Sequence, residues 1–275
     1  MKITCLMDDH NVPGNLNSEH GLSLYIKMKN HHILFDTGQS AQFISNAIKL
    51  GINLNQVNIV VISHGHYDHG GGLKAFLKMN QHAKVYIQAD AFQDFYSLRE
   101  NNNYAYIGLD KSLKNHPQVK LIKGDYLIDP NLQIIHKIKE QEMYPKGNQS
   151  LYVKKKDTYV HDDFSHEQSL LIHAGHQEVL IAGCAHRGIL NIIQATNVFT
   201  KAMLDLVVGG FHLKTRHAEY AFSKSEIEFL AEQLKDKSRY YLTGHCTGDA
   251  YQTIKRLLKN QVDIFYPGKY IEMPD

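Results

Sequence analysis

The stretch Ser63–Gly72 constrains the fold more than any other part of the chain. It reads Ser-His-Gly-His-Tyr-Asp-His-Gly-Gly-Gly and directly follows the apolar segment Val57–Ile62. An apolar run of this kind is typical of a strand buried on both faces, so we expect a strand over Val57–Ser63. Apolar residues at helical spacing over Leu73–Met79 predict a helix after the glycines. The polar cluster therefore occupies a tight turn between a buried strand and a helix.

The spacing inside this turn is suited to metal binding. His64 and His66 lie two residues apart, and in an extended chain such residues point to the same side, so both can bind one ion. Asp68 and His69, where the chain turns into the helix, can face a second ion. Imidazole and carboxylate ligands suit zinc, iron, manganese or nickel. The alternative is a solvated polar loop, which the buried strand leading into four ligand-type residues disfavours.

The rest of the chain shows first strands and then strands that alternate with helices. This order favours a layered α/β architecture. We expect strands at Lys2–Met7, Gly21–Met28, His32–Asp36, Ala83–Gln88, Ser169–His173, Val179–Gly183, Leu204–Gly209, Arg239–Thr243 and Ile264–Tyr266, and helices at Ala41–Leu50, Ile189–Asn197, Ser225–Leu234 and Asp249–Leu258.

The length favours a single domain over residues 1–275, because a single core stops growing at about 250–300 residues; two tightly fused halves are the alternative. Between about residues 89 and 147 the pattern loosens. Three asparagines at 101–103, the tyrosines Tyr104 and Tyr106, and Asp129-Pro130 are typical of loops. We interpret this stretch either as an insertion that covers a site or as a part of the domain whose elements the sequence pattern predicts poorly.

Composition excludes several classes of partner. With 30 basic and 28 acidic residues the net charge is +2, so the chain lacks the excess of basic residues typical of proteins that bind nucleic acid or an anionic membrane. No run of about eighteen apolar residues predicts a membrane span. The N-terminus meets Asp8 and Asp9 too early for a signal peptide. Three cysteines without paired spacing fit reduced thiols, so we expect a cytoplasmic protein.

The His-x-His-x-Asp-His series after a strand resembles the signature of the metallo-β-lactamase superfamily. Phe35-Asp36-Thr37-Gly38 is similar to that superfamily's Asp-Thr-Gly turn, so Asp36 is expected to buttress the metal loop from outside the ligand set. The resemblance extends from Glu19 to Gly268. It implies a four-layer αββα sandwich and a binuclear metal centre, with two zinc ions expected and iron or manganese as alternatives.

A narrower resemblance covers five segments that occur in a fixed order. They are similar to the branch named after the 7,8-dihydropterin-6-methyl-4-(β-D-ribofuranosyl)-aminobenzene-5′-phosphate synthase. The segments are Glu19–Ser23, Ser63–Leu73, Gly183–His186, Gly209–Leu213 and Thr243–Gly248.

The resemblance implies further metal ligands at the ends of later strands. His245, after the strand Arg239–Thr243, matches the last histidine of the superfamily. The superfamily's middle histidine has no obvious counterpart, and we expect His186 to replace it. Other candidates for that position are His166, His173 and His176.

Three residues are expected to contact substrate. Cys184 stands where superfamily members usually carry a metal-bridging Asp; a metal ligand and a small buried residue are its alternative roles. His212 follows the strand Leu204–Gly209 and can serve as a substrate contact or acid/base residue, with a structural role as the alternative. His20, in Glu-His-Gly-Leu-Ser, is the third candidate.

Together these residues predict a metal-dependent hydrolase. Two ions sharing a hydroxide lower its pKa and place it for attack on an ester or phosphoester. Asp68 is expected to ligate the second ion and to accept the nucleophile's proton. The expected substrate is a small molecule, with or without a phosphate group. Two alternatives stay open: a pterin-linked synthase or transferase of the dihydropterin type, and a non-catalytic ligand sensor that holds metal.

Overall fold

A computed structural model describes residues 1–11, 14–139 and 142–274; residues 140 and 141 of the expected insertion lie outside the described residues. The chain forms two compact units. Unit 1 consists of Met1–Asp94, Ile107–Lys123 and Phe265–Asp275, and unit 2 of Phe95–Tyr106 and Gly124–Ile264. The single domain and its insertion stay a prediction.

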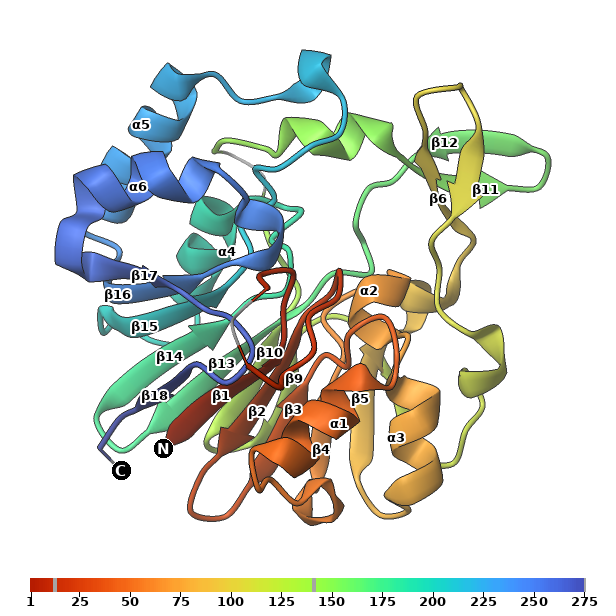
Figure 1. The fold of residues 1–275 in the computed structure, drawn as a ribbon, viewed down its shortest axis with the longest axis vertical. Coiled ribbons are helices and arrows are strands. Elements are labelled where there is room, and N and C mark those ends of the chain that lie inside the picture. Colours follow the sequence, from red (N-terminus) through yellow and green to blue (C-terminus); the bar gives the residue numbers. More distant parts are fainter. Residues whose placement is uncertain (12–13, 140–141, 275) are drawn as a thin grey trace. The chain divides into compact units, whose positions relative to one another are not determined.

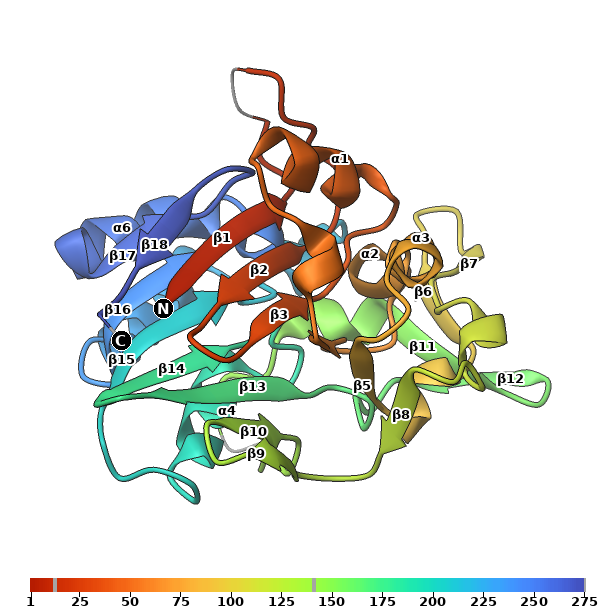
Figure 2. The ribbon, with the colours of Figure 1, turned by 90° about the horizontal axis from the view of Figure 1, so that it is seen from below.

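Unit 1 is built on a seven-stranded mixed sheet (Figure 1). Its strand order is β18 (Tyr270–Glu272), β1 (Lys2–Met7), β2 (Ser23–Lys27), β3 (His32–Phe35), β4 (Ile59–Val61), β5 (Lys84–Gln88) and β8 (Val119–Ile122). The four strands β18 to β3 pair antiparallel, and β3 to β8 pair parallel. The first and last strands of the chain lie side by side in this sheet (Figure 2).

Helices α1 (Gln42–Lys49) and α3 (Leu73–Met79) pack against this sheet through apolar side chains at helical spacing. The single helical turn α2 (Tyr67–Gly70) lies between them in the sequence. Phe43 of α1 and Phe76 of α3 share one core with Leu34, Val60 and Val85 of the sheet. Burying an aromatic side chain of this size contributes about 2–3 kcal/mol, so these contacts fix the helix that follows the His-rich turn.

Unit 2 contains a second seven-stranded mixed sheet. Its strand order is β17 (Val262–Ile264), β16 (Ser238–Thr243), β15 (Leu204–Gly209), β14 (Gln177–Ile181), β13 (Ser169–Ala174), β10 (Leu132–Ile135) and β9 (Tyr126–Asp129). Strands β14 to β17 are parallel, so their carboxyl ends meet at one edge of the sheet.

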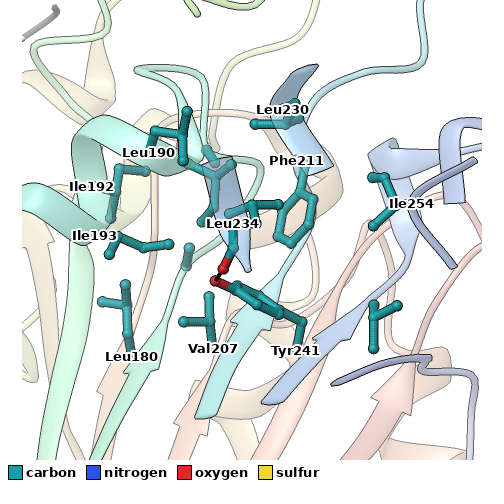
Figure 3. Close-up of a cluster of buried hydrophobic side chains, with 14 of the residues drawn as sticks. Leu180, Leu190, Ile192, Ile193, Val207, Phe211, Leu230, Leu234, Tyr241 and Ile254 are labelled. Atoms are coloured by element: carbon teal, nitrogen blue, oxygen red, sulfur yellow. Dashed lines mark hydrogen bonds between the residues drawn. The ribbon is translucent and has the colours of Figure 1, made fainter. Parts of the chain in front are cut away.

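Three helices cover one face of this second sheet: α4 (Ile189–Thr196), α5 (Lys224–Leu234) and α6 (Ala250–Leu258). Figure 3 shows the core between them, with Leu190 of α4, Leu230 of α5 and Ile254 of α6 around Val207. The Tyr241 hydroxyl in this core donates a 2.5 Å hydrogen bond to the carbonyl of Leu234.

Unit 2 also carries a four-stranded antiparallel sheet. Its order is β12 (Thr158–His161), β11 (Leu151–Lys155), β6 (Phe95–Leu98) and β7 (Tyr104–Tyr106). Short 3₁₀ turns occur in both units. In unit 1 they are Leu54–Gln56, Ala89–Phe92 and Lys111–Leu113, and in unit 2 Lys146–Ser150, Ala218–Tyr220, His245–Thr247 and Lys259–Gln261. The loop character expected for residues 89–147 is wrong for much of that stretch, because β6 to β10 lie in it. These strands are only three or four residues long, which is too short for a clear periodicity in the sequence.

Elsewhere the expected elements are confirmed to within a few residues, and the α/β class with them. No helix among the described residues is both long and apolar enough to cross a membrane.

Candidate metal centre

In unit 1 the His-rich turn has the strand–turn–helix setting that the sequence predicts. It follows β4, and Asp68 and His69 lie on the single turn of α2. The ring of His64 lies 4.6 Å from that of His66 and 4.2 Å from that of His69, centroid to centroid. The turn therefore gathers three imidazoles and one carboxylate.

The carboxylate of Asp36 supports this turn through hydrogen bonds. Its side chain is fully buried, and it accepts hydrogen bonds from Ser63 N (2.7 Å), Ser63 Oγ (2.7 Å) and His69 Nδ1 (2.6 Å). Because the Ser63 hydroxyl donates to Asp36, it accepts from His64 Nδ1 at 2.8 Å. Both rings thus carry their proton on Nδ1, which leaves the lone pair on Nε2 for a cation.

Glycines let the neighbouring segments pack directly on the turn. A Cβ atom at Gly71 would lie 2.3 Å from the carbonyl oxygen of Gln39, and one at Gly72 would lie 2.3 Å from that of Thr37. A Cβ at Gly21 would lie 2.4 Å from the carbonyl oxygen of Asp68. Any side chain at these positions would push the backbones apart, so only glycine fits.

His20 contacts the same cluster. Its Nε2 lies 3.3 Å from Oδ2 of Asp68, and its Nδ1 lies 3.0 Å from Oδ2 of Asp9. The ring is 44% exposed, which is compatible with the expected contact to a substrate. Asp9 is a partner that the sequence did not single out.

In unit 2 the candidate residues follow the carboxyl ends of three neighbouring parallel strands. Ala185, His212 and His245, in the turns after β14, β15 and β16, have φ angles of 57°, 48° and 48°. Left-handed backbone at a residue with a side chain costs of order 1–3 kcal/mol and is concentrated at functional sites. The carboxyl ends of parallel strands are also where α/β proteins bind their ligands.

The ring of His186 is fixed by a side chain far away in the sequence. Asn148 Nδ2 donates to the carbonyl of His186 at 2.7 Å, so its Oδ1 faces His186 Nδ1 at 2.9 Å and accepts from it. The ring also stacks on Phe164 at 4.4 Å. As in His64 and His69, the lone pair is therefore on Nε2.

Glu167 fixes the backbone of the same turn. Its two oxygens accept from the backbone N–H groups of His186 (2.6 Å) and Arg187 (2.8 Å). Burial raises the pKa of this carboxyl, although both N–H donors act in the opposite direction. Glu167 therefore fixes the backbone from which the His186 ring projects.

Two cysteines join the histidines of unit 2. The ligand atoms of Cys184, His245 and Cys246 lie within 4.8 Å of one another, and so do those of Cys184, His186 and His212. Burial would raise the pKa of the Cys246 thiol, but hydrogen bonds with Cys184 and His212 and the charges of His245 and His212 hold it well below its usual value.

The other candidates for the middle ligand have different partners. Buried His166 Nε2 lies 3.0 Å from Oδ2 of Asp162, and partly buried His173 Nδ1 lies 2.7 Å from Oε2 of Glu178. His176 is exposed in the turn between β13 and β14. These positions support His186 as the replacement.

Reasoning from the sequence missed Asn148, Glu167 and Cys246. Asn148 directly follows the stretch 89–147, which we interpreted as an insertion, and no local signal marks it. Cys246 directly follows His245 in a Gly-rich turn, and this adjacency could have identified it.

The donors present fit a divalent metal ion. Each unit offers buried imidazoles whose Nδ1 is held by a polar partner, and carboxylate or sulfur donors lie beside them. Among the described residues, the buried Nδ1 of His212 has no hydrogen-bond partner. A ring whose Nδ1 donates to a fixed partner and whose Nε2 faces the ion is the usual setting of a metal-binding histidine.

Comparison with known proteins agrees with this chemistry. The profile of the metallo-β-lactamase superfamily matches residues 18–190. The chain is 27% identical to "Uncharacterized protein MJ0448" of Methanocaldococcus jannaschii over 84% of its own length and 85% of the relative. It is 26% identical to the 7,8-dihydropterin-6-methyl-4-(β-D-ribofuranosyl)-aminobenzene-5′-phosphate synthase of the same organism, over 93% and 90% of the two chains.

Among solved structures, Tm1679, described as a metal-dependent hydrolase of the β-lactamase superfamily, matches with a TM-score of 0.83 and 31% identity over 100% of both chains. This similarity shows the metallo-β-lactamase fold that the motifs implied. Because the superfamily profile matches well over half of the 275 residues and this structure matches them throughout, the chain belongs to the metallo-β-lactamase superfamily.

Proposed function

We propose that the protein is a hydrolase that uses two divalent metal ions, zinc being the expected metal, on a small-molecule ester or phosphoester. The observation that carries this proposal is the common orientation of three imidazoles. In His64, His69 and His186, Nδ1 donates to a fixed acceptor and Nε2 is left as the metal-binding atom. Tm1679, described as a metal-dependent hydrolase, supports the reaction class.

Five of the proposed metal ligands match the superfamily motifs: His64, His66, Asp68, His69 and His245. The sixth is His186, which is expected to replace the missing middle histidine. Bound ions would supply Lewis acidity, which lowers the pKa of water and stabilises negative charge on the oxygen of the substrate.

The protein's own residues orient the reacting groups. We propose that Asp68 accepts the proton of the nucleophile, while His20 orients its carboxylate through the 3.3 Å contact and is itself oriented by Asp9. His212 is the proposed substrate contact in unit 2, and Cys184 is proposed either to contact substrate or to bind metal.

Metal analysis combined with activity assays tests the proposal. We expect His66→Ala to lose bound metal and nearly all hydrolysis of generic phosphodiester and thioester substrates. His173→Ala is the matched control, because it removes a histidine whose partner is a glutamate on the neighbouring strand. A His66→Ala protein with full metal content and full activity would refute the assignment.

A synthase reaction is the second candidate, favoured by the 26% identity to the dihydropterin synthase over most of both chains. Tight metal binding without hydrolysis, together with carbon–nitrogen bond formation on a dihydropterin substrate, would favour the synthase. Tight metal binding with neither activity would favour a ligand sensor.

A further inference from the structure

Two of the three cysteines lie close together where the parallel strands of the second sheet end. Cys184 follows β14 and Cys246 follows β16, and the Cys246 thiol donates to the carbonyl of Cys184 at 3.6 Å. With His245 they form a group whose ligand atoms lie within 4.8 Å of one another. From a Zn–S distance of 2.3 Å, ligand atoms around a tetrahedral ion lie roughly 3.4–3.8 Å apart. Closing this group on an ion therefore needs shifts of about 1 Å or less.

The backbone is shaped to admit the Cys246 sulfur. A Cβ atom at Gly210 would lie 2.3 Å from that sulfur, so the glycine leaves the space that Cys246 fills. The backbone N–H of His212 donates to the same sulfur at 3.2 Å. Backbone N–H donors to cysteine sulfur are a recurrent support for thiolate ligands. His245, next to Cys246, reaches its position through a left-handed φ of 48°.

We propose that Cys184 and Cys246, together with His245, form a sulfur-containing metal position that selects a thiophilic cation such as Zn²⁺, Cd²⁺ or Co²⁺ over Mg²⁺ or Mn²⁺. This inference rests on the proposed metal-dependent function and adds the class of metal to it. Thiolate ligands favour soft and borderline ions, whereas carboxylate and water favour hard ones. The superfamily pattern places an Asp at the position of Cys184, so two sulfurs would change the preference of this position.

Cobalt spectroscopy on the full chain tests the proposal without any activity assay. Thiolate ligands give Co²⁺ an intense charge-transfer band in the near ultraviolet, which imidazole and carboxylate ligands do not. The metal-free protein is titrated with Co²⁺ without oxygen, and the bound ion is counted separately by elemental analysis. We expect a band in the wild type that Cys184→Ser and Cys246→Ser each reduce by about half, since each variant removes one of two sulfurs.

Cys5→Ser is the matched control, because Cys5 is buried in β1 of unit 1 and donates to the carbonyl of Met7. Its spectrum should equal that of the wild type. If Cys246→Ser does not fold, the intensity of the Cd²⁺–thiolate band per bound ion in the wild type gives the number of sulfurs directly.

The outcomes separate this inference from the proposed function. An unchanged band in folded Cys246→Ser, or bound Co²⁺ without any thiolate band, would overturn the sulfur position while the metal-dependent function stands. Failure of the protein to bind Co²⁺ or Zn²⁺ at all would overturn both. Equal binding of Mg²⁺ and Zn²⁺ at this position would contradict the predicted selectivity.

Discussion

Replacing Asp36 with asparagine tests how the His-rich turn is oriented. The carboxylate accepts from Ser63 N through Oδ1 and from Ser63 Oγ and His69 Nδ1 through Oδ2. Asparagine has the same shape, but an NH₂ group replaces one acceptor oxygen. If the amide oxygen keeps the bond to Ser63 N, the NH₂ group faces two donors. His69 then has to move its proton to Nε2, the atom proposed to bind metal.

The expected loss of affinity follows from this change of tautomer. Removing the partner that orients a metal-binding histidine costs 10- to 100-fold in metal affinity, or about 1.4–2.8 kcal/mol. Each buried donor left without an acceptor costs about 1–3 kcal/mol of folding free energy. The Asp36→Asn protein should therefore be less stable and should also bind metal more weakly.

A competition titration of Zn²⁺ against a chromophoric chelator measures the affinity, and urea denaturation of the metal-free protein measures the stability. Glu178→Gln is the control, because it removes a carboxylate that contacts an imidazole, that of His173, without altering the His-rich turn. Its zinc affinity should equal that of the wild type. If Asp36→Asn unfolds more easily but binds Zn²⁺ within twofold of the wild type, Asp36 has only a structural role.

Three further predictions concern unit 2. Asn148→Leu removes the acceptor that orients His186, so zinc affinity in the same titration should fall by roughly tenfold. A hydrogen bond from Lys146 is the largest cause of the low pKa of Glu226, about 2. Glu226→Gln should therefore lower the free energy of unfolding by up to about 1 kcal/mol above pH 4.5, and this difference should vanish as pH falls toward 2 in urea titrations. Burial raises the pKa of Tyr241 above 10, so Tyr241→Phe should cost about 1 kcal/mol at neutral pH and make stability less sensitive to pH above 10.

Local patterns in the sequence were sufficient for most of the fold. The apolar strand before His64, the glycines after His69 and the stripe on α3 predict the strand, turn and helix, because neighbouring residues determine each of them. The role of Asp36 was also accessible, although only through the resemblance to the superfamily motif.

Contacts between distant segments could not be predicted in the same way. Asn148 and His186 are 38 residues apart, and an asparagine in a polar stretch gives no sign of the imidazole that it will face. The contact of Cys246 with Cys184 spans 62 residues and depends on the order of β14, β15 and β16 in the sheet. Periodicity indicates which residues form strands, but it does not determine which strand ends become neighbours.

The close packing at Gly21, Gly71 and Gly72 determines when the His-rich turn becomes ordered. Backbone segments of the same chain touch there without intervening side chains. The turn therefore has no room to rearrange unless these segments separate. The entropy cost of ordering it is therefore met when the chain folds and not when an ion arrives. Amides of residues 63–72 should show equal protection from hydrogen exchange with and without metal, and an ion should leave by stepwise release of its ligands while the loop stays folded.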